Sequence, residues 1–79
     1  MDKVSEKVRE LFVKSFHLEP DEVTDEAELR RDLDMDSTEV VELVVALEQE
    51  FNIKITDGEV TNRQKFGDVV QTIRSKLAS

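Results

Sequence analysis

The sequence predicts an all-α protein, a four-helix bundle with a long first loop and a short third helix. Apolar residues recur at intervals of three and four along three long stretches, which is the pattern of helices with one buried face. No stretch alternates apolar and polar residues, so we expect no β-sheet. The 79 residues leave room for one domain, spanning 1–79. A chain of this size buries only about 60% of its unfolded surface.

The first predicted helix runs from about residue 2 to residue 16. Its apolar stripe consists of Val4, Val8, Leu11, Phe12 and Phe16. A long connection follows at residues 17–36, in which Pro20 and Asp21 have turn chemistry. Connections of this length inside a small domain are usually functional or held by their own side chains. The apolar anchors expected here are Leu18, Val23, Leu29 and Leu33.

The second predicted helix begins at Ser37 and ends near Phe51. Asp36 is a good N-cap residue, and Glu39 three positions later completes a capping box. Ser37 therefore falls in the first turn, exposed beside unpaired backbone N–H groups. An anion is favoured there, which suits a serine that carries a phosphodiester. The inward stripe of this helix is Val40, Leu43, Val44, Leu47 and Phe51.

Two further helices complete the predicted bundle. Thr56 and Glu59 form a capping box, which predicts a short third helix that ends by Asn62. The last helix has a clear apolar stripe, formed by Phe66, Val69, Val70, Ile73 and Leu77.

Negative charge is concentrated around Ser37. From Glu19 to Glu50 there are 13 acidic residues against two basic ones, so this segment carries −11 while the whole chain carries −8. The sign argues against nucleic acid as a partner. Acidic runs are often only solvated faces. With a serine in the middle of this one, we interpret it as a docking surface for basic patches of partner enzymes.

Metal and membrane sites are not predicted. The chain has no cysteine, which excludes disulfides and thiolate metal sites. The acidic run from Asp32 to Asp36 has the opening spacing of an EF-hand loop, but Ser37 and Leu43 stand where that loop needs glycine and glutamate. Loose divalent binding by the crowded carboxylates stays open. There is no apolar run that could span a bilayer, so we expect a cytoplasmic monomer without membrane insertion.

Catalysis by this chain is not expected either. His17 is the only histidine, and its place at the end of the first helix favours a structural role over that of a general base. Ser37 has carboxylates for neighbours and no histidine or lysine to activate it. We interpret Ser37 as the substrate of another enzyme.

Asp36-Ser37, followed by Val41-Glu42-Leu43-Val44 and Ala46-Leu47-Glu48, resembles the prosthetic-group site and second helix of acyl carrier proteins. The likeness extends to Pro20-Asp21-Glu22-Val23, Asp32-Leu33, Ile55 and Asp57. It implies that Ser37 carries 4'-phosphopantetheine, attached by a phosphopantetheinyl transferase that uses coenzyme A and recognises Asp36. The thiol of that group would hold acyl chains as thioesters for fatty-acid or related lipid or polyketide biosynthesis.

The resemblance also implies roles for residues of the second helix. Acyl-transfer and fatty-acid-synthesis-type enzymes would dock on Thr38, Glu39, Val41, Glu42, Val45 and Glu48. The acyl chain would enter a pocket lined by Val44 and Leu47. One set of apolar side chains would then serve both as core and as pocket lining.

Some positions depart from the family pattern. Thr38 stands where leucine usually follows the motif serine, Asp34 where a small residue, often glycine, is common, and Arg63 where an apolar residue often closes the third helix. These departures leave open a specialised pathway in place of general fatty-acid synthesis. Two alternatives stay open beside it, an aminoacyl or peptidyl carrier and an acidic helical interaction module that carries nothing.

Overall fold

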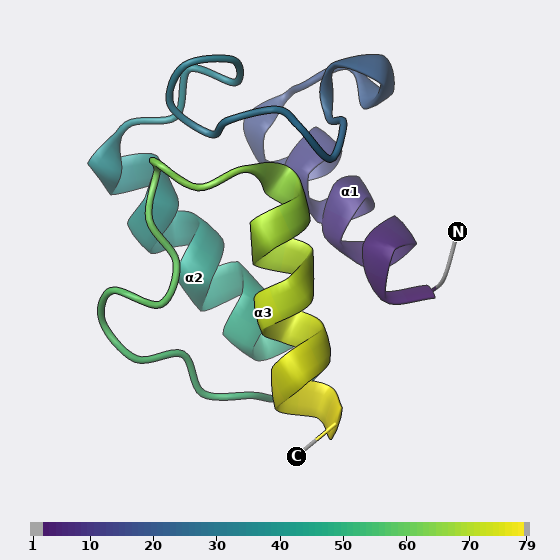
Figure 1. Ribbon diagram of the computed structural model, residues 1–79, viewed down its shortest axis with the longest axis vertical. Helices are drawn as coiled ribbons and strands as arrows, with labels where there is room; N and C mark the ends of the chain where they lie inside the picture. The colour runs from purple at the N-terminus through teal and green to yellow at the C-terminus, as the bar shows by residue number, and fades with distance from the viewer. Residues whose placement is uncertain (1–2, 79) are drawn as a thin grey trace.

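A computed structural model describes residues 3–78, which form three α-helices and one 3-10 turn. The elements are α1 (Lys3–Phe16), η1 (Pro20–Glu22), α2 (Ser37–Phe51) and α3 (Phe66–Ala78). Figure 1 shows the 17–36 connection crossing one end of the three helices, while the segment between α2 and α3 runs back along α2. The predicted all-α class and long first loop are confirmed.

The predicted third helix is wrong, because residues 56–62 form turns. The local contacts expected of Thr56 and Glu59 are present in part. The Thr56 N–H donates to Glu59 Oε1 at 2.7 Å, and the Glu59 N–H donates to the Thr56 carbonyl oxygen at 3.2 Å. Gly58 between them has a φ of 90°, which lies outside the right-handed helical region. The segment therefore makes one turn and does not continue as a helix.

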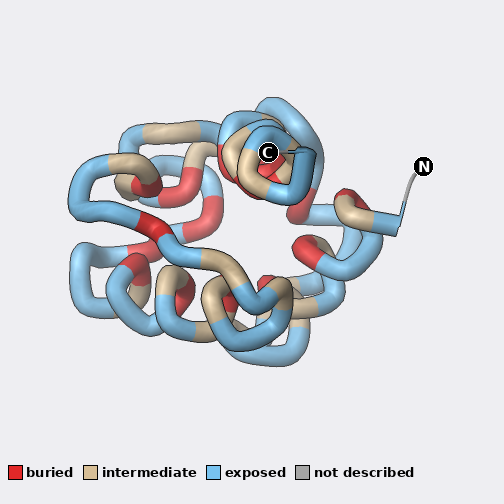
Figure 2. Tube along the Cα trace, turned by 90° about the horizontal axis from the view of Figure 1, so that it is seen from below, coloured by how far each residue is buried: buried red, intermediate tan, exposed pale blue. Residues whose placement is uncertain are grey.

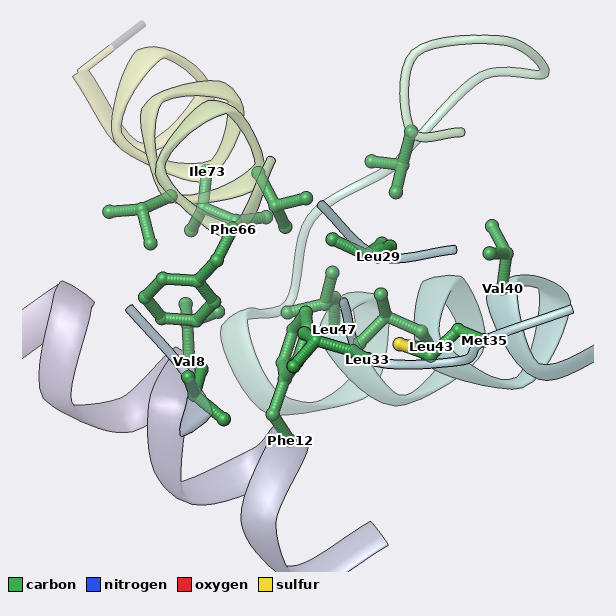
Figure 3. Packing of buried hydrophobic residues seen from close by; sticks show 14 of the residues in the cluster. Val8, Phe12, Leu29, Leu33, Met35, Val40, Leu43, Leu47, Phe66 and Ile73 are labelled. Atoms are coloured by element: carbon green, nitrogen blue, oxygen red, sulfur yellow. The ribbon is translucent and has the colours of Figure 1, made fainter. Parts of the chain in front are cut away.

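The core lies between the helices and the two long connections. Figure 2 shows buried residues along the inner side of each segment, and Figure 3 shows their side chains meeting. Phe12 of α1 and Phe66 of α3 pack edge to face, with ring centroids 5.1 Å apart. The buried apolar residues of the helices are Val8, Phe12, Val40, Leu43, Leu47, Phe66, Val69, Val70 and Ile73.

Most of the predicted stripes agree with this core. The predicted positions that are only half-buried are Val4, Leu11, Phe16, Val44 and Phe51. Leu77 was predicted to face inward but is 45% exposed, because it lies in the last turn of α3, beyond the reach of the other helices.

The 17–36 connection is held by buried side chains and by backbone hydrogen bonds to the segment before α3. The Leu29 N–H donates to the Gln64 carbonyl oxygen at 3.0 Å, and the Phe66 N–H donates to the Ala27 carbonyl oxygen at 2.8 Å. The buried residues of the connection are Val23, Ala27, Leu29, Leu33 and Met35. Three of the four predicted anchors are thus confirmed, and Leu18 is half-buried. The loop is a packed part of the fold.

Gly67 allows this loop to approach α3 closely. Its N–H donates to the Asp25 carbonyl oxygen at 3.0 Å, and a Cβ on Gly67 would lie 3.1 Å from the same oxygen. Any larger residue would push the loop outward. In residues 3–78, no helix combines the length and the apolarity needed to cross a bilayer.

Candidate functional site

The candidate site begins at the N-terminus of α2, where the predicted capping box is present. The Glu39 N–H donates to Asp36 Oδ1 at 2.8 Å, and the Asp36 N–H donates to Glu39 Oε1 at 3.1 Å. These two bonds satisfy one free N–H of the first helical turn and fix the entry of the chain into the helix. Ser37 follows directly and its side chain is exposed. Its hydroxyl is therefore accessible on a rigid helix end.

The residue on the other side of the cap is an anchor. Met35 is only 1% exposed, its N–H donates to the Leu29 carbonyl oxygen at 2.9 Å, and its own carbonyl accepts from Asn62 Nδ2 at 3.4 Å. The backbone just before Ser37 is thereby fastened to both long connections. The sequence reasoning missed Met35, although an apolar residue within an acidic run was a signal for it.

The backbone conformation of Asp34 explains why this residue can stand where the resemblance suggested a small one. Its φ is 55°, in the left-handed region where glycine has no steric cost and aspartate is among the better tolerated of the other residues. The backbone must turn here so that Met35 points inward while Asp36 caps α2. The backbone conformation thus favours glycine or aspartate at this position over most other residues.

An open groove runs from Ser37 along α2. Its first part, about 220 Å³, is lined by Ser37, Val40, Gly58, Val60, Thr61 and Asn62. The second part, about 230 Å³, is lined by Val40, Val41, Val44, Val45, Ile55, Thr56, Asp57, Gly58 and Val60. The two parts share Val40, Gly58 and Val60, so they adjoin. A Cβ added at Gly58 would meet no atom within 4 Å, so the space beside this shared residue is open.

Of the two residues predicted to line an acyl pocket, only Val44 lines the groove. Leu47 is fully buried at 0% exposure and belongs to the central core. The remaining apolar lining comes from residues that the sequence reasoning did not single out, above all Ile55 and Val60 of the segment that was expected to be helical.

The outer face of α2 combines apolar and acidic side chains. Val41 and Val45 are 63% and 48% exposed, and Thr38 and Glu42 are exposed as well. Glu48 has a structural role, because its Oε2 accepts a hydrogen bond from the Ile55 N–H at 2.8 Å. Glu39 is likewise engaged by the cap. Among the predicted partner residues, Glu42 is the glutamate with neither of these structural roles.

Few of the 13 acidic residues between Glu19 and Glu50 have a cationic neighbour. Within residues 3–78, ion pairs engage four of them, namely Glu26, Glu28, Asp32 and Glu50. The pKa of Asp32 is lowered, mainly because its carboxylate accepts the Glu28 N–H at 2.8 Å and also because Arg31 is close. The other carboxylates repel one another across an open surface.

We expect salt and magnesium to stabilise the fold by damping this repulsion. At about 0.1 M salt the Debye length is near 10 Å, which screens most pairs of exposed charges. The melting temperature should rise by several degrees from low to moderate salt, and a few millimolar magnesium should do the same at constant ionic strength. Thermal denaturation followed by circular dichroism measures both. A melting temperature that stays flat or falls in both titrations would contradict this electrostatic account.

The metal site and the histidine considered in the sequence analysis are not part of this groove. Within the described part of the chain, no three histidine, aspartate or glutamate side chains are placed to hold a metal ion together. His17 is exposed and follows the last residue of α1 with a φ of 56°. It ends the helix and does not line the groove.

Comparisons with known proteins identify the family to which the chain is similar. Residues 6–73 match the family model described as the phosphopantetheine attachment site. The acyl carrier protein of Wolinella succinogenes is 40% identical over 72 residues, covering 91% of this chain and 95% of that protein. The acyl carrier protein of Phenylobacterium zucineum is 38% identical over 79 residues, the full length of both chains.

Proposed function

Because the chain belongs to the phosphopantetheine-binding family of acyl carrier proteins, we propose that Ser37 is the residue that carries its 4'-phosphopantetheine. The observation that carries this proposal is the exposed Ser37 hydroxyl on a capped helix N-terminus, at the open end of a groove with apolar walls. A phosphate ester is favoured at such a helix end. When bound, the prosthetic group supplies a flexible arm and a thiol that holds acyl chains as thioesters.

Loading would be the work of a phosphopantetheinyl transferase. The Ser37 Oγ–phosphorus bond forms as the diphosphate bond of coenzyme A breaks, the adenosine bisphosphate leaves, and the hydroxyl proton passes to the transferase. This chain contributes the accessible nucleophilic oxygen and the fixed helix end. It acts as a carrier, and the bond-making groups belong to its partners. The competing assignment is an acidic interaction module that carries nothing.

The test of this proposal is loading in vitro. The protein is incubated with coenzyme A and a broad-specificity phosphopantetheinyl transferase, and its intact mass is measured. We expect a gain of one phosphopantetheine per chain. A mass that does not change, under conditions in which a known carrier is fully loaded, would leave the interaction module as the better account.

The groove beside Ser37 is the place where we propose that the acyl chain is sheltered. Its aliphatic lining from Val40, Val44, Ile55 and Val60 can cover methylene groups, each worth about 0.8 kcal/mol when buried. The chain would belong to fatty-acid or related lipid or polyketide synthesis. Aliphatic lining favours this over an aminoacyl or peptidyl cargo, which needs polar partners. Thr38, exposed beside Ser37, supports a specialised pathway, since it replaces a larger apolar contact.

The outer face of α2 is the proposed docking surface for the partner enzymes. Exposed Val41 and Val45 offer apolar contact, and the unshared carboxylate of Glu42 lies between them in the sequence. Charges on the rim of an interface act mainly on the association rate and lose their effect in salt. Glu42 should therefore speed the encounter with basic patches.

We expect Glu42→Lys to slow loading by the transferase roughly ten-fold at low salt and much less at high salt. Glu10→Lys, which makes the same change of net charge on an exposed position of α1, is the matched control and should load almost as wild type. Initial loading rates at several ionic strengths measure both. Equal rates for Glu42→Lys and Glu10→Lys at every ionic strength would remove α2 from the docking surface.

A further inference from the structure

The outer wall of the groove has little backbone support of its own. This wall, residues 56–61, contributes Thr56, Asp57, Gly58, Val60 and Thr61 to the lining. Among the described residues, one backbone hydrogen bond has both ends within it, the bond from the Glu59 N–H to the Thr56 carbonyl oxygen at 3.2 Å. Segments without repeating backbone bonds open easily. The position of the wall therefore depends on side-chain contacts.

Two side chains hold the wall: Val60, which is buried in the core at 6% exposure, and Glu59, which makes the polar contacts. Its Oε1 accepts from the Thr56 N–H and from Thr56 Oγ1, both at 2.7 Å, and pairs with Lys76 Nζ at 2.8 Å. The Lys76 and Glu59 side chains are 24% and 35% exposed, so the ion pair is partly shielded from solvent. Lys76 foremost, together with the Thr56 donors, lowers the pKa of Glu59 to about 2.

Lys76 connects the wall to a rigid element. It lies in the last turn of α3, and the preceding turn is fixed in the core by Ile73, which is 0% exposed. A second link comes from Gln64, whose Nε2 donates to the Glu59 carbonyl oxygen at 3.1 Å. The Gln64 contact holds the main chain of Glu59 from the segment just before α3, and the Lys76 contact holds its side chain from the end of α3.

We propose that the ion pair between Lys76 and Glu59 is a latch that ties the 56–61 wall to the end of α3, so that the groove opens less widely and shelters acyl chains only up to a limited length. The limit on chain length rests on the proposed carrier function. The latch itself is a property of the unmodified protein. Without Lys76, the Glu59 carboxylate keeps only the donors of Thr56, which belong to the same wall, and the wall moves outward more freely.

The chain offers a control for this latch in a second, more exposed ion pair. Lys65 pairs with Glu26 at the same Nζ–Oε1 distance of 2.8 Å, with side chains that are 49% and 82% exposed, and it immediately precedes α3, whereas Lys76 lies near the end of that helix. Neither Lys65 nor Glu26 lines the groove beside Ser37. Lys65→Met and Lys76→Met therefore remove the same charge and the same kind of contact, and only the second removes the link to the wall. Lys76→Arg retains a cation at the latch.

The first measurement uses the protein without any prosthetic group. Backbone amide hydrogen exchange is followed by NMR for Thr56 and Glu59, the wall residues whose N–H groups donate hydrogen bonds. We expect exchange to be roughly three-fold faster in Lys76→Met, as for the loss of a partly exposed ion pair. Lys65→Met and Lys76→Arg should exchange as wild type does. Equal exchange in Lys76→Met and wild type would overturn the latch.

The second measurement uses acyl chains from hexanoyl to hexadecanoyl, loaded on the arm at Ser37. The rate of thioester cleavage by hydroxylamine reports how well each chain is sheltered. In wild type and in Lys65→Met, protection should stop growing at the same length, and in Lys76→Met it should extend to longer chains. The same length limit in all three would overturn the role in cargo length. If Ser37 takes no arm at all, the carrier function and the cargo limit both fail, while the exchange rates still decide the latch.

Discussion

Replacement of Ser37 by alanine should abolish loading completely and leave the fold intact. The side chain of Ser37 is exposed and, within residues 3–78, makes no hydrogen bond. Surface substitutions of this kind change the free energy of unfolding by less than about 0.5 kcal/mol. Loading, in contrast, needs the hydroxyl oxygen itself, so no residual modification is expected. Intact mass after incubation with coenzyme A and transferase measures the loss, and thermal denaturation measures the retained stability.

Ser15→Ala is the matched control for this prediction. Ser15 is also exposed and also lies in a helix, α1, but it is not at a helix N-terminus. This variant should load at the rate of wild type. If Ser37→Ala still gained one phosphopantetheine, the attachment point would be another of the chain's serines, Ser5, Ser15, Ser75 or Ser79, and the site described above would be wrong.

Replacement of Leu47 by alanine should destabilise the fold strongly, because Leu47 and Leu43 are the two leucines of α2 that are 0% exposed. Leu47 is fully buried between the helices, and truncation of a buried leucine costs about 2 to 5 kcal/mol through lost burial and the cavity left behind. In a domain of this size each kcal/mol lowers the melting temperature by roughly 4 to 8 °C. A fall of at least about 10 °C is therefore expected in thermal denaturation.

Val44→Ala tests the lining of the groove separately from the core. Val44 is half-buried and lines the groove, so its truncation should cost less stability than that of Leu47 but should weaken the protection of a bound acyl chain. Leu47→Ala should lower the stability more than Val44→Ala does and should weaken the protection of the acyl chain less. If Leu47→Ala left the melting temperature unchanged and removed acyl protection, Leu47 would be a pocket residue, as the family resemblance implied, and its place in the core would be wrong.

The parts of this protein that could be predicted from sequence are those fixed by local chemistry. The cap of α2 and most of the apolar stripes of α1, α2 and α3 follow from residues three and four positions apart, and the bonds between Asp36 and Glu39 are the ones expected. The same local logic failed at Thr56 and Glu59. There the capping contacts form in part, but Gly58 takes a left-handed conformation. The capping pattern of Thr56 and Glu59 gave no sign of that conformation.

The parts that could not be predicted depend on contacts between distant segments. Met35 is buried because both long connections close over it, and Asn62 reaches the site through its hydrogen bond to Met35. The lining of the groove by Ile55 and Val60 depends in the same way on where the 56–61 wall stands. Periodicity identifies which face of a helix is buried, but it does not identify which side chains border a groove between a helix and a loop.

The hydrogen bonds between residues 25–30 and residues 62–67 have a consequence for biosynthesis. They join segments more than thirty residues apart in the chain, and closing such a loop costs conformational entropy that only the completed core repays. A chain still emerging from the ribosome without residues 62–67 lacks the partners that hold the backbone before Ser37. The transferase would thus find an ordered Ser37 only on a complete chain, and the prosthetic group would not be attached to incomplete chains.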